Sequence, residues 1–271
     1  MVMIILSGFV AAFAVLLLLY LFVLVRPAAK MPSDERLLCD YAHRGLHGNG
    51  VPENSLEAFR LAVEGGYGIE LDIQLSKDRE VMVFHDYTLS RMTGREGKLS
   101  EFTADELSKL SLAGTDEYIP KLREVLRLVD GKVPLLVELK GEDFNTELCD
   151  KAAELLSKYG GPYCVESFNP ILLGRMAKLL PDVYRGILFT NVVKDKKRAA
   201  PLNLIVSCMA SNVLARPNFI ACNEVYRNSP AAKICTGFYK AKCFTWTHKT
   251  RESYDKAKRN GEYAIFEDFM P

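Results

Sequence analysis

The sequence predicts an α/β protein: a (β/α)8 barrel with a small insertion after its second strand, preceded by one transmembrane helix. Three observations support this prediction. No residue from Met1 to Val25 carries a charged side chain. In the rest of the chain, short β-rich runs alternate with runs of helical periodicity, and eight such units are typical of a closed barrel. Residues 37–271 also have the length of a single barrel domain.

The composition of the chain excludes several classes of protein. Its 271 residues contain 35 basic and 34 acidic side chains, so there is no basic excess to neutralise a nucleic-acid backbone. Hydrophobic residues make up 49% of the chain, which is too high for a disordered protein. The seven cysteines form no CxxC pair, so we expect reduced core thiols rather than a zinc or redox site. We expect no nucleic-acid partner, and no pattern indicates a protein partner.

The first 26 residues are predicted to form a membrane span. The apolar run Val2–Val25 would reach roughly 36 Å as a helix, and a hydrocarbon core is about 30 Å thick. A removable signal peptide has a basic start, a shorter apolar core and a small-residue cleavage site. A buried core helix of this length would normally have one polar face. Because the run matches neither alternative, we expect a retained single-pass anchor, with residues 27–36 as a juxtamembrane linker.

The charges around this span predict its orientation. Arg26, Lys30 and Arg36 follow the span, and no Lys or Arg precedes it. Basic residues favour the cytoplasmic side of a membrane. We therefore expect a protein of the cell membrane whose barrel, residues 37–271, faces the cytoplasm.

The predicted strands are continuous apolar runs, which is the pattern of a parallel sheet covered by helices. Residues 81–85 are counted as an extension of the second strand. The eight predicted strands cover residues 37–42, 67–75, 133–140, 162–168, 183–189, 218–224, 241–246 and 263–268. Residues 87–118 interrupt the alternation and are predicted to form the insertion, in which a short helix begins at Thr103.

The second strand carries two carboxylates near its end, where the chemistry of such a barrel is located. Glu70 and Asp72 are two residues apart and point to the same face, and their apolar neighbours predict that this face is the barrel interior. Two such carboxylates repel each other unless a cation lies between them or one is protonated. Glu138 on the next strand completes an all-oxygen set, which favours Mg²⁺ or Ca²⁺ over zinc. Lys140, two residues further, is placed to bind an anion.

Two of the four histidines, His43 and His85, end predicted strands. Together with Arg44 and the carboxylates they suit general acid and base catalysis at neutral pH, with cations that hold a phosphate. A single histidine at a strand end is more often a structural residue. We expect His47 on the loop surface and His248 in a structural position.

The segment from Tyr41 to Gly94 contains HRG, PENS, ELDI and VFHD in this order. It closely resembles the start of the glycerophosphodiester phosphodiesterase family. The resemblance continues through residues 119–126, 133–141, 165–170, 244–247 and 266–271, and it is poor over residues 190–240.

This resemblance implies hydrolysis of a glycerophosphodiester to sn-glycerol 3-phosphate and an alcohol, with a divalent cation as cofactor. His43 and His85 would then be the acid and base. The implied metal ligands are Glu70, Asp72 and Glu138, and the implied phosphate clamp is Arg44 with Lys140. Asn54 would fix the loop beneath His43 or approach the metal, and Trp246 would flank the substrate.

Several alternatives remain open at the level of sequence. An anchored barrel lies near lipid, so a lysophospholipid cleaved at the same bond, as by a lysophospholipase D, is a second substrate class. The insertion, with Tyr87, Met92, Phe102 and Leu112, could cover an acyl chain or simply pack on itself. A non-catalytic module that binds glycerophosphodiesters is a third reading. The attacking group would be the glycerol 2-hydroxyl or a water molecule.

Overall fold

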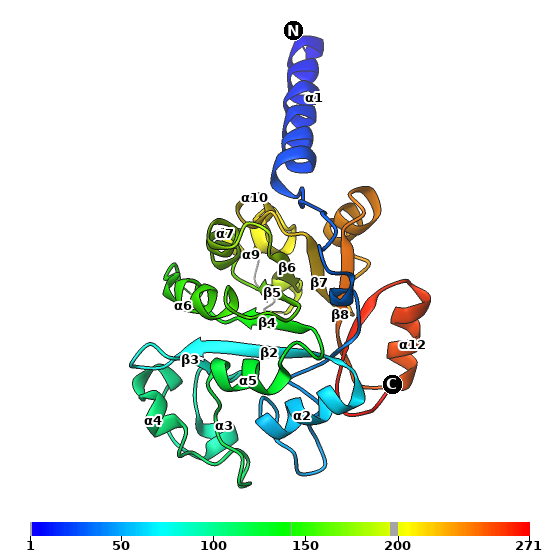
Figure 1. The fold of residues 1–271 in the computed structure, drawn as a ribbon. Helices are drawn as coiled ribbons and strands as arrows, with labels where there is room; N and C mark the ends of the chain where they lie inside the picture. The colour runs from blue at the N-terminus through cyan, green and yellow to red at the C-terminus, as the bar shows by residue number, and fades with distance from the viewer. Residues whose placement is uncertain (1, 142, 196–199) are drawn as a thin grey trace.

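A computed structural model describes residues 2–141, 143–195 and 200–271 (Figure 1). Within these residues eight parallel strands close into a barrel, because β1 pairs with both β2 and β9. The predicted barrel is confirmed. The barrel strands are β1 (Tyr41–Ala42), β2 (Gly68–Leu75), β4 (Leu135–Leu139), β5 (Tyr163–Ser167), β6 (Tyr184–Phe189), β7 (Phe219–Asn223), β8 (Lys242–His248) and β9 (Tyr263–Phe266). A further short strand, β3 (Val81–Val83), pairs antiparallel with β2.

Helices cover the outside of the barrel, and short helical segments fill the connections. The α-helices are α1 (Val2–Leu19), α2 (Leu56–Gly65), α3 (Ser90–Thr93), α4 (Ala104–Leu107), α5 (Leu122–Val129), α6 (Glu147–Leu156), α7 (Pro170–Leu179), α8 (Val192–Asp195), α9 (Pro201–Ser207), α10 (Asn212–Ala215), α11 (Pro230–Lys233) and α12 (Arg251–Arg259). Two π-helical turns, η1 (Tyr20–Leu24) and η4 (Ile234–Phe238), and two 3₁₀ turns, η2 (Glu35–Leu37) and η3 (Leu99–Glu101), complete the set.

Local sequence explains why helices follow strands. At the start of α2, the Ser55 side chain accepts a hydrogen bond from the backbone N–H of Ala58, and Gly66 ends the helix in the left-handed conformation. The next strand, β2, is buried on both faces. Ile69, Leu71 and Ile73 pack into the core between barrel and helices, which leaves the alternate residues pointing into the barrel.

Aromatic and aliphatic side chains fill the interior of the barrel. A fully buried cluster includes Tyr41, Leu136, Phe219 and Phe244. Gly186 makes room for the ring of Phe219, because a Cβ atom at Gly186 would lie 2.0 Å from that ring. The interior is therefore a packed core, and a small cavity opens at the carboxyl ends of the strands.

One detail of the predicted topology is wrong. Residues 81–85 do not extend the second strand; β3 folds back and pairs antiparallel with β2, with Ile73 opposite Val83. The chain reverses because the Ser76 N–H donates to the Glu80 carbonyl and Arg79 adopts a positive φ of 64°. As a result, His85 returns to the mouth of the barrel from outside the ring of parallel strands.

The segment between β3 and α5 folds around its own small core. Met92, Leu99, Leu107 and Leu112 are buried together in a cluster separate from the main core. The predicted helix start at Thr103 is confirmed, since its hydroxyl accepts from the Glu106 N–H and caps α4.

The N-terminal helix projects away from the barrel (Figure 1). Residues Leu6–Leu24, in α1 and η1, are long and apolar enough to cross a membrane and have a mean hydropathy of 2.6. The foot of this helix is attached to the barrel. The Asn212 Nδ2 donates to the Val25 carbonyl at 2.8 Å, and the Tyr239 hydroxyl donates to the Leu21 carbonyl at 2.7 Å. Both partners precede β7 and β8, so the helix is attached at the amino ends of the strands.

Candidate active site

Most of the residues that the sequence analysis selected line one small cavity at the carboxyl ends of the strands, and Asp72 and Asn54 lie directly behind its wall. The cavity has a volume of about 110 Å³. Its lining residues are His43, Arg44, Glu70, His85, Glu138, Lys140, Glu166, Phe168, Leu188, Trp246, Thr247 and Ile265. Segments at both ends of the chain contribute, since His43 follows β1 and Ile265 lies on β9.

Three carboxylates form the centre of this site. Oxygen atoms of Glu70, Asp72 and Glu138 all lie within 4.8 Å of one another, and all three side chains are buried. Burial and the negative charge of Asp72 raise the pKa of Glu70 well above its ordinary value. The same two causes raise the pKa of Glu138 to about 7. The cluster therefore holds more negative charge than its protein neighbours neutralise.

Positive and amide groups hold Asp72 in its charged form. Burial alone would raise the pKa of Asp72, but Lys140, His85 and Arg44 together hold it below its ordinary value. Lys140 Nζ lies 3.3 Å from Asp72 Oδ1 and 3.1 Å from Glu138 Oε1. Asn54 Nδ2 donates to Asp72 Oδ2 at 2.9 Å. Asn54 thus fixes one of the carboxylates and, through its N–H to the Arg44 carbonyl, the loop that follows β1.

Arg44 connects the loop to the carboxylates by both its backbone and its side chain. Its backbone N–H donates to Glu70 Oε2 at 2.8 Å, and its guanidinium lies 3.5 Å from Asp72 Oδ2. The backbone of Arg44 has a positive φ of 55°, an uncommon conformation for a residue with a side chain. The short turn after β1 therefore directs an N–H, a guanidinium and the preceding imidazole of His43 toward the same cavity.

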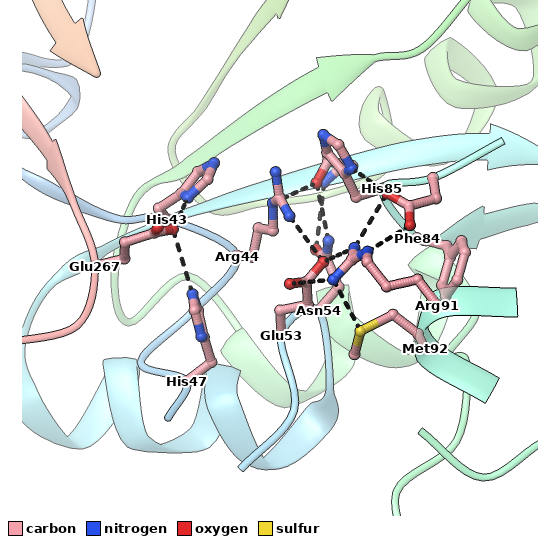
Figure 2. Close-up of polar contacts among 12 residues, drawn as sticks. His43, Arg44, His47, Glu53, Asn54, Phe84, His85, Arg91, Met92 and Glu267 are labelled. Carbon is pink, nitrogen blue, oxygen red and sulfur yellow. Dashed lines mark hydrogen bonds and ion pairs between the residues drawn. The ribbon is translucent and has the colours of Figure 1, made fainter. Parts of the chain in front are cut away.

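A carboxylate positions each of the two cavity histidines. His43 Nδ1 pairs with Glu267, which follows β9, and His85 Nδ1 lies 2.6 Å from Asp86 Oδ1 (Figure 2). Each ring is thereby held at Nδ1, which leaves Nε2 available to the cavity. Burial lowers the pKa of both His43 and His85. Both are therefore mostly neutral at pH 7.

His47 does not lie on the loop surface, so that expectation is wrong. Its side chain is only 15% exposed, and its Nε2 lies 3.6 Å from Glu267 Oε2. Glu267 also pairs with Lys249. Glu267 is itself mostly buried beside His43, so the His47 side chain that contacts it is mostly buried as well. Glu267 is thus contacted by three nitrogen groups, and its hydrogen bond to His43 helps to hold its pKa low despite burial.

The second histidine belongs to a chain of charged side chains that reaches the segment after β3. Arg91 on α3 donates to Asp86 Oδ2 and to Glu53 Oε1, each at 2.6 Å. Glu53 in turn accepts from Arg44 at 2.8 Å. Figure 2 shows Arg91 and Glu53 on the side of Arg44 that faces away from His43. Arg91, in the segment after β3, therefore connects Asp86, the partner of His85, to Glu53, the partner of Arg44.

The wall nearer the solvent is aromatic. Trp246 and Phe168 form an edge-to-face pair with ring centroids 5.7 Å apart, and the Trp246 Nε1 donates to the Ala221 carbonyl at 2.9 Å. Glu166, two residues before Phe168, lies deeper in the cavity. His248 is fully buried, hydrogen-bonds Thr245 at 2.8 Å and does not line the cavity.

Several polar residues of the site were not selected from the sequence, among them Asp86, Arg91, Glu166 and Glu267. Asp86 follows the selected His85, and Glu166 ends the fourth predicted strand, so their place at strand ends was the available signal. Glu267 lies 224 positions from His43, and only the closure of the barrel brings the two together. Arg91 lies in the insertion, which the sequence analysis considered only as a cover for an acyl chain or as a segment that packs on itself.

The chain was then compared with known proteins. Residues 43–271 match the glycerophosphoryl diester phosphodiesterase family. A glycerophosphodiester phosphodiesterase of Caldanaerobacter subterraneus is 38% identical over 160 residues, which cover 55% of this chain and 65% of that relative. The match thus spans just under two thirds of the relative's length.

Solved structures show the same fold. An Oleispira antarctica phosphodiesterase in complex with the product sn-glycerol-3-phosphate covers 85% of this chain and 92% of its own, with a TM-score of 0.71 and 25% identity. A glycerophosphodiester phosphodiesterase of Thermotoga maritima has a TM-score of 0.65 and 27% identity over 84% of this chain and 94% of its own. With its barrel, its cavity and a family match over residues 43–271, the chain belongs to the glycerophosphoryl diester phosphodiesterase family.

Proposed function

We propose that the protein hydrolyses glycerophosphodiesters to sn-glycerol 3-phosphate and an alcohol, with a divalent cation and two histidines. One observation carries this proposal: two histidines, each held by a carboxylate, line the same cavity as Arg44, Lys140 and two of the three clustered carboxylates, Glu70 and Glu138. Membership of the family and the names of its relatives support the reaction class.

The histidines would move the protons of the reaction. His43 and His85 approach the cavity from opposite sides of Arg44 (Figure 2). One Nε2 would take the proton of the attacking hydroxyl while the other would give a proton to the departing alkoxide. Because both rings are mostly neutral, the acid would gain its proton next to the phosphate anion, whose charge favours the imidazolium. Arg44 and Lys140 would bind the phosphate oxygens.

The attacking group would be the glycerol 2-hydroxyl, which forms a cyclic phosphate that water then opens with the two roles exchanged. Direct attack by water would use the same two histidines. The routes differ for a substrate that lacks the 2-hydroxyl, because only direct attack cleaves it.

The residues present fit a divalent cation. Glu70, Asp72 and Glu138 offer hard oxygen ligands within 4.8 Å of one another, the donor set that Mg²⁺ and Ca²⁺ prefer. Burial and the charge of its neighbours raise the pKa of Glu70, and a cation among these carboxylates would offset their repulsion. A bound cation would polarise a phosphoryl oxygen and neutralise developing charge. Lys140 and Asn54 would keep the ligands in place.

The structure gives less support to the other readings. Of the four side chains considered for an acyl chain, Met92 and Leu112 pack into the core of their own segment and Phe102 packs against it, which leaves Tyr87, 38% exposed. A module that only binds glycerophosphodiesters would not need two histidines each paired with a carboxylate. Hydrolysis of a glycerophosphodiester remains the function that the site favours.

We also propose that Leu6–Leu24 is a retained membrane anchor and that the barrel faces the cytoplasm. The helix is uncharged and exposed from Leu6 to Leu19, and Arg26 and Lys30 follow it, as expected for the cytoplasmic end of a span. The hydrogen bonds from Asn212 and Tyr239 to its foot support a helix that stays part of the folded protein.

Replacement of either histidine should remove most of the activity. We expect His43→Ala and His85→Ala each to lower kcat on glycerophosphocholine by roughly 10²- to 10⁴-fold, because each loses a proton-transfer group. The matched control is His248→Gln, which alters a buried histidine outside the cavity and should keep near-normal turnover per folded molecule. Release of glycerol 3-phosphate is measured with a coupled dehydrogenase. Near-normal turnover in either alanine variant would contradict the assignment.

Glu267 should act as a positioning residue for His43. Glu267→Gln should lower kcat by about 10- to 100-fold, as loss of a group that orients a catalytic residue does. The negative charge of Glu267 raises the pKa of His43, so its removal should shift the limb of the pH–rate profile that His43 controls to lower pH. Asp268→Asn, next to it and without contact to His43, should leave the profile unchanged. Identical profiles for the two variants would show that Glu267 does not act on His43.

The cation site can be measured without catalysis. We expect calorimetric titration with Mg²⁺ or Ca²⁺ to show one binding event that Glu70→Gln and Asp72→Asn both abolish, since each removes a ligand. Glu154→Gln, on the exposed side of α6, is the control and should bind as the unaltered protein does. Chelator should remove the activity of the unaltered protein. Full activity in chelator, or normal cation binding by Asp72→Asn, would refute the metal proposal.

A further inference from the structure

We propose that Glu166 binds the terminal hydroxyl of the glycerol moiety and so restricts the enzyme to deacylated glycerophosphodiesters. This inference rests on the proposed function and specifies its substrate class. It identifies a residue that binds the position of glycerol at which a glycerophosphodiester and a 1-acyl lysophospholipid differ.

Glu166 is a buried acceptor without a partner. It lies on β5 opposite Glu138 of β4, is 1% exposed and lines the cavity. Its Oε2 atom has no hydrogen-bond partner among the described residues. A buried carboxyl oxygen without a partner is costly, and a ligand in the cavity can supply the missing donor. Lys140 does not serve this purpose, since its contacts at 3.1 and 3.3 Å are with Glu138 and Asp72.

The position of Glu166 indicates which part of the substrate it meets. The exposed fraction rises from 1% at Glu166 to 42% at Phe168, two residues nearer the solvent. The leaving alcohol differs between glycerophosphodiesters, so its place is the open aromatic wall of Phe168 and Trp246. The glycerol moiety is common to all of them, so its place is the closed end. With the phosphate bound by Arg44 and Lys140, the terminal hydroxyl of the glycerol moiety would lie next to Glu166.

An acyl chain at that hydroxyl would be rejected for two reasons. An ester oxygen carries no proton, so Glu166 would stay unpaired, and a site built to bind a hydroxyl discriminates strongly against an analogue without it. The cavity of about 110 Å³ is also far smaller than the roughly 300–1,000 Å³ of pockets for larger ligands.

The test compares three substrates of the full-length protein. They are glycerophosphocholine, its analogue without the terminal hydroxyl but with the 2-hydroxyl, and 1-acyl lysophosphatidylcholine. We expect kcat/KM to fall by about 10²- to 10⁴-fold for the analogue and by at least as much for the lysolipid. In Glu166→Ala, glycerophosphocholine should fall to the level of the analogue, because the group that distinguishes them is gone. Glu166→Gln keeps an acceptor oxygen and should still prefer glycerophosphocholine.

The outcomes separate this inference from the proposed function. If the unaltered protein cleaves glycerophosphocholine and the analogue equally well, Glu166 does not read the hydroxyl, although the hydrolysis stands. If it cleaves the lysolipid as fast as glycerophosphocholine, the proposed restriction is wrong. If it cleaves none of the three, the proposed function fails as well. The comparison of substrates needs no variant, so it tests the substrate restriction even if Glu166→Ala does not fold.

We infer separately that the surface around the foot of α1 rests on the lipid bilayer, with the active site directed away from it. Residues 200–215 contain no charged side chain, and in α9 the side chain of Leu202 is 70% exposed. Phe22 of the helix foot packs on Phe238 at 6.3 Å between ring centroids. The exposed apolar side chains of this foot surface are Phe22, Leu202, Leu204, Ile205, Leu214 and Phe238.

The occupant of the foot surface follows from its surroundings. It adjoins the lower end of the candidate span, since Tyr20 donates to the Cys208 carbonyl just after α9 and Asn212 of α10 donates to Val25. Arg216 donates to the carbonyl of Arg26 at 3.3 Å, which places basic groups beside the apolar side chains. Apolar side chains bordered by basic ones at the end of a span suit the headgroup region of an anionic bilayer.

This placement sets the direction of the active site. The foot surface lies at the amino ends of β7 and β8, whereas the cavity lies at the carboxyl ends of the strands. Figure 1 shows α1 and the site-bracing segment α3–α4 on opposite sides of the barrel. The substrate would therefore arrive from the aqueous phase rather than from the anchoring membrane.

Fluorescence of the full-length protein in vesicles tests this placement. Leu202→Trp in phosphatidylcholine–phosphatidylglycerol vesicles should show a blue shift and a loss of intensity when the lipids carry bromine. Val225→Trp is the matched control, because Val225 is 74% exposed and follows the carboxyl end of β7; its emission should not change. Leu214→Trp provides a second probe of the foot surface. Equal quenching at the two ends of the barrel, or quenching at Val225 alone, would overturn the inference.

Discussion

Burial of negative charge is the constraint on which the site depends. Glu70, Asp72, Glu138 and Glu166 point into a barrel where water screens them poorly, and the charges of Arg44 and Lys140 do not balance them. The raised pKa values of Glu70, Glu138 and Glu166, caused first by burial and then by neighbouring carboxylates, express this imbalance. A divalent cation and a bound phosphate would together restore it. The need for a cation would thus follow from the burial of these carboxylates on β2, β4 and β5.

The arrangement of the histidines has a second consequence. Each ring is held by a carboxylate as well as by its own backbone. Glu267, which follows β9, holds His43, and Asp86 holds the neighbouring His85. Arg91 of α3 ties Asp86 to Glu53 and so to Arg44. The segment after β3 is therefore a brace for the site. Most of its apolar side chains pack into its own core.

The barrel also has a direction. Its amino ends carry the attachment of the N-terminal helix, and its carboxyl ends carry the cavity. Parallel strands impose this separation, because all connections that enter strands lie at one end and all that leave them lie at the other. An enzyme attached to a membrane in this way would work on molecules dissolved beside the membrane, in agreement with a cavity closed by a polar group.

Local pattern was enough to predict the strands, the helices and the central residues of the site, because strand periodicity fixes the face of Glu70 and Asp72 and the end of each strand fixes His43. The apolar first 25 residues likewise predicted one exposed helix. Pattern could not predict the direction of β3, since a turn of a few residues decides it, or the inward position of His47. Nor could it predict the contact of His43 with Glu267. The two residues are 224 positions apart in the sequence, and they come together only because β9 pairs with β1. The sequence alone determined which chemical groups are present and at which strand ends they stand; the closed barrel decided which of them touch, because contacts between distant segments depend on its register and closure.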